Sequence, residues 1–402
     1  MKKIILLSLM CLFTTIQAFS QDCIEDVRYT LQRKEIGKAK RLIDECFAAN
    51  PQNADVLLMK ANVYLQRYSQ ELESLNKDRK YVIKDPDAIW IANDCFYQSI
   101  QINPNVKPKS GNFGSLEGQS LCAPYLYTLG KDALTDEKAE EAQRYFNAAI
   151  RSFNAKSSAE GNLYLIAIYS DLALIAQKKG DTVEYKKMLN SAINLKPKRA
   201  GSYLLLYDQL LLEGDTVNAV KMLKMARANV PDTLSQAIYN YEINYFAMMN
   251  DVEKLTSACD EFIAKFGETI DNLALIASYL NTAGQLDKAE VYIHKGLAIN
   301  SANFDLLYQM AYSYFAEALK YQSLLDEANN TTNFDLQEKL ATEQEVVLQK
   351  AHEWSQKAYD VKKDDPHNNN MLQQLKGRLH LPVPEELKTW LQEYKAKQQQ
   401  GK

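Results

Sequence analysis

Two stretches of this sequence repeat each other: residues 182–197 read TVEYKKMLNSAINLKP, and residues 216–231 read TVNAVKMLKMARANVP. Both contain Lys-Met-Leu at the same place and both end in a proline, so that Pro197 and Pro231 lie 34 residues apart. Within each stretch, apolar and small residues are spaced by four and three positions, which puts them on one face of a helix. A fixed period of this kind is typical of an array of repeated helical units.

The same spacing recurs along the chain. The copies are Ala39, Ile43, Cys46; Ala92, Phe96, Ser99; Ala142, Phe146, Ala149; Tyr185, Leu189, Ala192; Ala219, Leu223, Ala226; and Ala289, Ile293, Gly296. A second signature precedes these copies, with large residues around one small residue, as in Leu273, Ile276, Ala277 and Leu280. Because small side chains let two helices approach closely, each unit is predicted to be a helix-turn-helix.

This pattern resembles the tetratricopeptide repeat (TPR) family, whose 34-residue unit carries W-x2-L-G-x2-Y, then A-x3-F, then P. The resemblance implies an all-α, right-handed superhelical solenoid of about eight antiparallel helix pairs over residues 21–366. Two turns carry insertions, predicted as helical hairpins near residues 68–86 and 320–350. Residues 103–119 are predicted to be a flexible linker, because they hold three glycines and two prolines. Residues 367–402 are predicted to form C-terminal capping helices and a polar tail.

The first twenty residues have the features of a secretory signal peptide. Two lysines precede an apolar run from Ile4 to Ile16, and Ala18-Phe19-Ser20 places small residues where a signal peptidase cleaves. The run is too short for a membrane anchor, so residues 1–20 are predicted to be removed and the mature chain to begin at Gln21. No later segment is expected to span a bilayer. The protein is expected to be exported, to a bacterial periplasm first, with envelope association or secretion as alternatives.

Composition argues against several other classes of protein. Glycine and proline together supply 24 of 402 residues, about half the usual share, which favours long helices. The net charge of −4 provides no global field that would attract nucleic acid. The four histidines lack metal-ligand spacing, and neither a phosphate-binding glycine loop nor a nucleophile elbow occurs. We therefore expect no catalytic residue, no metal and no cofactor.

Five cysteines remain after signal cleavage, which is an odd number for an oxidising compartment. Cys23 and Cys46 fall on the two predicted helices of the first pair, and Cys95 and Cys122 on successive helices around the linker. Either pair could form a disulfide. The alternative is buried free thiols, since Cys46 occupies a small-residue position of the repeat.

The resemblance also implies that the first helix of each pair lines a concave surface, at positions about one and five residues after its signature begins. Candidate partner-binding residues there are Asn62, Ser170, Asp208, Asn240, Asn244, Ser278, Tyr308 and Tyr312. Amides and hydroxyls suit a peptide backbone or a sugar, because they donate and accept hydrogen bonds. We expect a non-catalytic scaffold or adaptor of the bacterial cell envelope that binds a protein or peptide in this groove. The alternative is a glycan-capture protein on a TPR-like scaffold.

Overall fold

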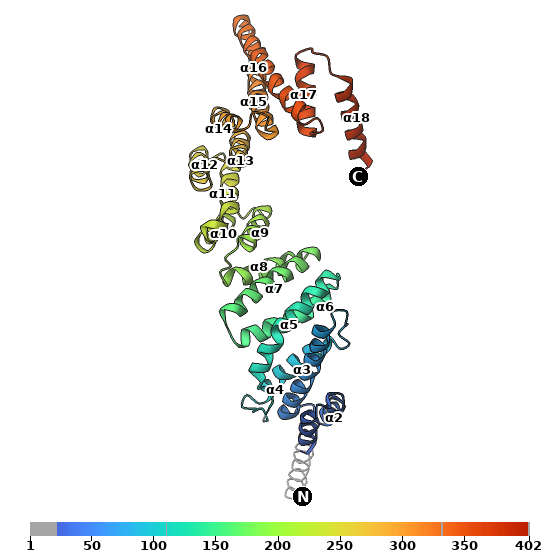
Figure 1. Cartoon of the computed structure of the whole chain (residues 1–402). Coiled ribbons are helices and arrows are strands. Elements are labelled where there is room, and N and C mark those ends of the chain that lie inside the picture. Colours follow the sequence, from blue (N-terminus) through green and yellow to red (C-terminus); the bar gives the residue numbers. More distant parts are fainter. Residues whose placement is uncertain (1–21, 110, 331–332, 401–402) are drawn as a thin grey trace. The chain divides into compact units, whose positions relative to one another are not determined.

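The computed structural model describes residues 22–109, 111–330 and 333–400, and every regular element in these ranges is a helix (Figure 1). The predicted signal peptide, residues 1–20, lies outside the described residues. The contacts between residues divide the chain into two compact units, one up to Met222 and one from Leu223 onward.

In the first unit, each helix packs against the next along the chain. A helix over residues 22–32 is followed by α2 (Ile36–Ala49), α3 (Ala54–Lys77), α4 (Asp87–Ile102), α5 (Ser115–Thr135), α6 (Ala139–Ala155), α7 (Ala159–Lys178), α8 (Thr182–Asn194) and α9 (Gly201–Leu212). Short turns join α5 to α6 and α7 to α8, so the two helices of each pair run in opposite directions. The next helix, α10 (Thr216–Asn229), contains the boundary between the units.

The second unit continues the same arrangement. Its elements are η1 (Asp232–Leu234), α11 (Gln236–Met248), α12 (Val252–Phe266), α13 (Ile270–Thr282), α14 (Leu286–Ile299), α15 (Phe304–Ala328), α16 (Phe334–Val361), α17 (Pro366–Arg378) and α18 (Glu385–Gln400). The last helix packs on α17 through Leu387 and Leu391, which are buried with Leu372.

The small residues of the repeat mark the points where helices approach most closely. Gly130 on α5 faces the ring of Phe146 on α6, and Gly296 on α14 faces Leu306 on α15. A Cβ atom at either glycine would overlap the facing side chain. The alanines of the repeat are fully buried at Ala39, Ala92, Ala142, Ala219 and Ala289. The predicted all-α array of antiparallel, TPR-like helix pairs is therefore confirmed.

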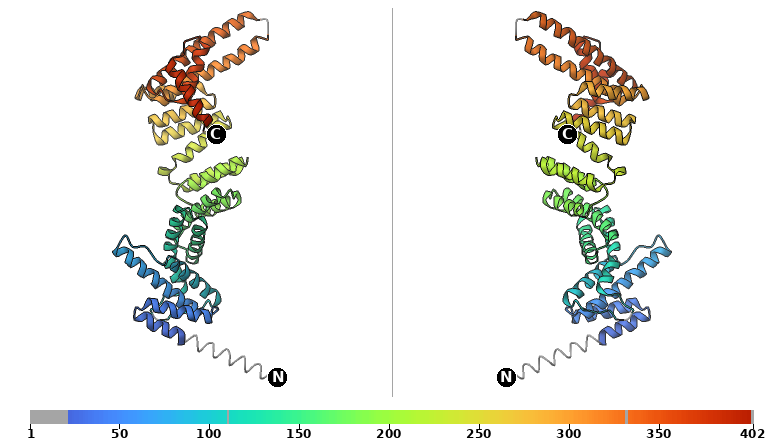
Figure 2. Two further views of the ribbon diagram at one scale, coloured as in Figure 1. Left: turned by 90° about the vertical axis from the view of Figure 1, so that its right-hand side faces the viewer. Right: turned by 90° about the vertical axis from the view of Figure 1, so that its left-hand side faces the viewer.

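The two insertions take different forms (Figure 2). In the first, α3 continues to Lys77, and residues 78–86 return to α4 without forming a second helix. In the second, α15 and α16 both run past the usual helix length and pack side by side as a helical hairpin. Leu325 and Leu340 are buried between these two helices. The first insertion is thus one lengthened helix with an ordered return, and not the predicted helical hairpin.

The predicted linker is shorter than expected, because α5 already begins at Ser115. Gly118, one of the glycines that suggested flexibility, lies inside this helix. It lies so close to Phe96 of α4 that a Cβ would overlap the ring, which explains a glycine at this helical position. Among the described residues of this segment, only 103–109 and 111–114 are irregular, and contacts described below hold Asn112 and Phe113 against α3.

Helix α7 corrects one expectation about membranes. Among the described residues it is the helix long and apolar enough to cross a membrane, by length and composition only. Its side chains Leu165, Ile168 and Leu172 are buried, and the helix packs against α6 and α8. Helix α7 is therefore packed within the helix array along one side, with 39% of its apolar window buried.

The cysteines differ in their bonding. Cys23 and Cys46 form a disulfide, with Cα atoms 6.2 Å apart, which joins the helix of residues 22–32 to α2. Cys95 and Cys122 are buried free thiols, so a bridge between these two is not formed. Each fills an apolar position of its own helix, and burial raises the pKa of the Cys95 thiol to about 12.

Candidate partner-binding surface

The first helices of the pairs leave one side uncovered. Within each unit they contact one another: Lys131 of α5 forms an ion pair with Asp171 of α7 at 2.9 Å, and Asn281 of α13 donates to the backbone carbonyl of Gln309 on α15 at 3.0 Å. Each first helix also packs on its own second helix. We call the remaining side of α3, α5, α7 and α9, and of α11, α13 and α15, the open face. The predicted partner-binding residues all lie on these helices.

The side chain of Asn62 is not available to a partner, because it is hydrogen-bonded to another segment of the same chain. Its side-chain amide donates to the carbonyl of Phe113 at 3.0 Å, and its side-chain oxygen accepts from the N–H of Phe113 at 2.7 Å. The same amide also donates to Leu58 within α3. Asn62 is consequently buried, and its prediction as a ligand-binding residue is wrong. Residues 111–114 lie against α3, and Phe113 uses the amide in the way a bound peptide would.

The other two candidates of the first unit are half-buried. The hydroxyl of Ser170 donates to the carbonyl of Ile166 at 2.8 Å and lies 3.4 Å from the hydroxyl of Ser202, so its bonding is already satisfied. Asp208 lies near Tyr185, and burial together with this negative charge raises the pKa of that phenol.

The polar candidates of the second unit differ in exposure. Asn244 is exposed, whereas Asn240 and Ser278 are half-buried. The side-chain oxygen of Asn240 is buried and accepts no hydrogen bond within the described residues. Such a buried acceptor is costly to leave unsatisfied, and in this structure it is closed to a donor from outside the protein.

Two tyrosines complete the candidates on α15. Phe304, Tyr308 and Tyr312 follow each other at helical spacing, with ring centroids 6.2 Å and 6.4 Å apart. Tyr308 is half-buried and burial raises its pKa, with smaller effects from Asp365 and Tyr312, while Tyr312 is 36% exposed. Three of the eight candidates therefore belong to the first unit and five to the second.

Sequence reasoning missed a set of exposed apolar residues in the first unit, which we call the apolar stripe. Its members are Leu121 and Tyr125 on α5, Leu163 and Leu174 on α7, and Leu205 and Leu212 on α9. On α7, Leu163, Ser170 and Leu174 share one face because they are seven and four residues apart. The available signal was that α7 is apolar outside its core positions as well as within them.

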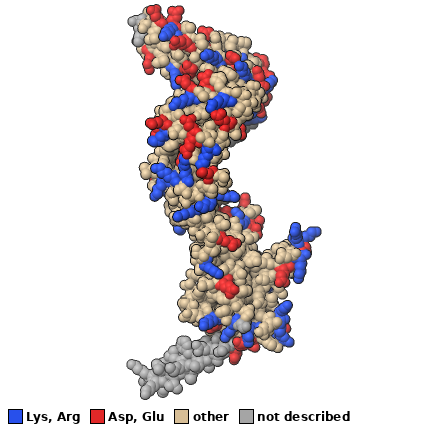
Figure 3. All heavy atoms as spheres, turned by 60° about the vertical axis from the view of Figure 1, so that its left-hand side comes forward, with Lys and Arg blue, Asp and Glu red and all other residues tan. Residues whose placement is uncertain are grey.

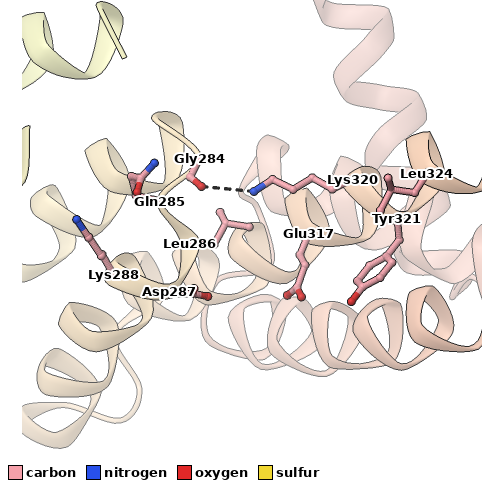
Figure 4. A pocket seen from close by; sticks show the side chains of 9 residues that line it. All are labelled: Gly284, Gln285, Leu286, Asp287, Lys288, Glu317, Lys320, Tyr321 and Leu324. Carbon is pink, nitrogen blue, oxygen red and sulfur yellow. Dashed lines mark hydrogen bonds between the residues drawn. The ribbon is translucent and has the colours of Figure 1, made fainter. Parts of the chain in front are cut away.

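A pocket of the second unit lies between the turn before α14 and the lengthened part of α15 (Figure 4). Its volume is about 460 Å³, and Leu286, Tyr321 and Leu324 line it together with charged side chains. Lys320 reaches across and donates to the carbonyl of Gly284 at 3.4 Å. Within the described residues, no group of three His, Cys, Asp or Glu side chains could hold a metal ion.

No protein-family model and no curated protein matches this chain. Solved structures do match, among them a tetratricopeptide repeat protein from Parabacteroides merdae, at 12% identity over 77% of this chain and 99% of that one, with a TM-score of 0.36. The C-terminal part of a TPR protein from Cytophaga hutchinsonii is 13% identical over 66% and 99%, with a TM-score of 0.37. A complex titled Naa15/Naa10 bound to HypK-THB is 15% identical over 92% of this chain and half of that one, with a TM-score of 0.38.

Similarity at these TM-scores concerns the fold alone. Two observations on this chain show the same fold: the repeated sequence pattern, and the helix pairs that bury its small residues. Together these two observations give the chain the fold of tetratricopeptide-repeat proteins.

Proposed function

We propose that this protein is a non-catalytic scaffold of the bacterial cell envelope, which binds an apolar segment of a partner protein on the open face of α5, α7 and α9. The observation that carries the proposal is the apolar stripe. Leu163 is 67% exposed and Leu212 is 83% exposed, on helices whose other faces are well packed. Contiguous exposed apolar side chains on a folded protein typically mark an interaction surface.

The energetics favour an apolar partner over a purely polar one. Burying one exposed leucine side chain completely contributes about 1.5–3 kcal/mol, so a few such contacts support specific binding. The hydroxyl of Ser170 is already bonded within the protein and adds little. The stripe is less suited to a glycan, because Tyr125 is its one aromatic member and the leucines of α7 and α9 offer no ring faces on which a sugar could stack.

The disulfide between Cys23 and Cys46 supports placement in the envelope. Disulfides form and persist in oxidising compartments such as the bacterial periplasm and are rare in the cytosol. Export to the periplasm is therefore part of the proposal, with attachment to the envelope or secretion as its variants.

The test compares two charge insertions of the same kind. Leu163→Asp with Leu174→Asp places carboxylates on the apolar stripe, and Val183→Asp places one on α8, where Val183 is 77% exposed but off the open face. Proteins captured from a periplasmic extract should be lost with the double variant and kept with the control. An identical set of captured proteins for all three baits would refute a binding role for the stripe.

A second variant tests the polar candidates separately. Asn240→Ala with Asn244→Ala alters α11 in the second unit and leaves the stripe intact. If this variant also loses the captured protein, the partner extends over both units. If only the stripe variant loses it, recognition is confined to the first unit.

A further inference from the structure

Residues 77–85, which are the last residue of α3 and most of the return segment, form a loop that is ordered by one buried carboxylate. Glu71 on α3 accepts hydrogen bonds from the hydroxyl of Tyr81 at 2.7 Å and from the backbone N–H of Lys84 at 2.9 Å. The guanidinium of Arg67 forms an ion pair with the same carboxylate at 3.0 Å, and the Glu71 side chain is only 3% exposed.

These contacts keep Glu71 ionised inside the fold. Burial by itself would raise the pKa of this carboxyl, yet the N–H of Lys84, the hydroxyl of Tyr81 and the charge of Arg67 hold the pKa below its ordinary value. The turn is fixed further by Asp78, whose side chain accepts from the N–H of Lys80 at 2.9 Å. The loop is thus a shaped projection, although it packs against little else.

The loop concentrates positive charge at its end. Lys77, Arg79 and Lys80 are exposed, and among the described residues their side chains form no ion pair and no hydrogen bond. In Figure 3, Lys and Arg side chains gather at the end of this projection. Val82, between Lys80 and Lys84, is 78% exposed. Some cations elsewhere in the array do pair across repeats, as Arg144 does with Asp87.

Positive charge is not a general feature of the insertions that project from this array, because the second insertion is acidic. Between Lys320 and Lys339 the hairpin of α15 and α16 carries four acidic residues, Asp326, Glu327, Asp335 and Glu338, and no Lys or Arg. The charge of residues 77–85 is therefore a property of this loop and not of hairpin ends in this protein.

We propose that residues 77–85 form a second binding surface, separate from the open face, for an acidic segment of a partner protein that places carboxylates around Val82. A protein partner is favoured over an anionic membrane because Glu71 and Asp78 hold the backbone of this loop in one shape. A membrane attracts flexible basic segments equally well through summed charge, and two acidic residues reduce the net charge of this loop. A backbone that already has its bound shape, by contrast, reduces the entropy that is lost when a matching set of carboxylates binds.

The experiment uses the full-length mature protein and a fluorescein-labelled, Glu-rich peptide with a central valine, compared with a peptide in which Gln replaces Glu. Binding is followed by fluorescence anisotropy at low salt. We expect the Glu peptide to bind more tightly than the Gln peptide. Arg79→Glu with Lys80→Glu should weaken its binding about tenfold or more. The matched reversal Lys198→Glu with Arg199→Glu, at exposed residues before α9, should change it less than about twofold.

A second pair of variants separates a shaped site from a merely basic one. Glu71→Gln removes a negative charge, so simple electrostatic attraction predicts tighter binding of the acidic peptide, whereas a shaped loop predicts weaker binding. Tyr81→Phe removes one hydrogen bond to Glu71 without changing charge, and should weaken binding in the same direction. Circular dichroism checks that both variants keep their helices.

Four outcomes would overturn the proposal. The first three are equal losses of peptide affinity for the two charge reversals, tighter peptide binding by Glu71→Gln, and binding to phosphatidylglycerol vesicles without preference for the Glu peptide. The fourth is self-association at low salt that is abolished by Arg79→Glu with Lys80→Glu, because the occupant would then be a second copy of this chain. None of these outcomes bears on the apolar stripe, which the extract experiment tests independently.

Discussion

At the scale of single residues, Asn62 is the side chain whose contribution to the free energy of unfolding can be argued most directly. Its side chain satisfies both the N–H and the carbonyl of Phe113, which lie in an otherwise irregular segment. Asn62→Ala would leave two backbone groups without partners, and we expect a loss of about 1–3 kcal/mol in the free energy of unfolding. Urea denaturation measures this loss, and amide hydrogen exchange at residues 111–114 should accelerate.

The matched control is Asn244→Ala on α11, an exposed asparagine at the corresponding predicted position. Its effect on the free energy of unfolding should stay within about 0.5 kcal/mol. Equal effects of the two substitutions would show that the contact with Phe113 does not stabilise the fold.

Asn62 also shows what sequence can and cannot supply for a site. The repeat pattern predicts an amide at this position that could bind the backbone of a partner, whereas in the structure the amide binds the backbone of Phe113. This backbone belongs to the same chain, and the contact joins residues that are 51 positions apart in sequence. No periodic pattern predicts a contact at that separation. The apolar stripe was missed for a related reason: an apolar residue on α7 is assigned to the core unless its neighbours are known.

At the scale of elements, the first helix pair has a covalent link that the other described pairs lack. The disulfide closes a loop between residues 23 apart in sequence, which corresponds to about 3 kcal/mol of stabilisation in the chain-entropy account. Cys46→Ser, or reduction of the native protein, should therefore lower the stability of the helix of residues 22–32 and α2. Thermal unfolding followed by circular dichroism with and without reductant measures this loss.

An internal control comes from the same variant. Cys95, Cys122 and Cys259 are already free thiols, so a reductant should have no further effect on Cys46→Ser. A further loss of stability on reduction would mean that another disulfide exists.

The helices themselves were largely predictable, whereas the insertions and the linker were not. The repeat signatures predict the positions of α8 and α10 in the sequence well, because each residue of the pattern has one role in packing. Residues 78–86 contain no repeat signature, and their shape depends on Glu71. The burial of Glu71 results from tertiary packing, which a local sequence pattern does not predict. Gly118 similarly suggested flexibility, but its position is decided by the ring of Phe96 on another helix.

At the scale of the whole molecule, the described contacts connect neighbours along the chain. Within each unit, helix pairs touch neighbouring pairs along the chain, and the division between the two units falls within α10. The sequence gives no sign of this division, because the clearest period, residues 182–231, runs through it. In such arrays stability is approximately a sum of repeat and nearest-neighbour terms, so a local change is felt locally.

Two glycine substitutions test this locality. Gly130→Ala forces a methyl group against Phe146 in the first unit, and Gly296→Ala forces one against Leu306 in the second. Each should cost about 1–3 kcal/mol through overpacking. Hydrogen exchange followed by mass spectrometry should show faster exchange in α5 and α6 for the first variant, and in α14 and α15 for the second. Gly37→Ala, where a Cβ would meet nothing within 4 Å, is the control.

The double variant then decides between a chain of local units and one cooperative block. If the units are energetically separate, the two losses add within about 0.5 kcal/mol and each variant leaves exchange in the other unit unchanged. If Gly130→Ala also accelerated exchange in α14 and α15, the array would unfold as a whole. A partner bound to the apolar stripe would in that case stabilise the second unit as well as the first, because binding to one part of a cooperative block stabilises all of it.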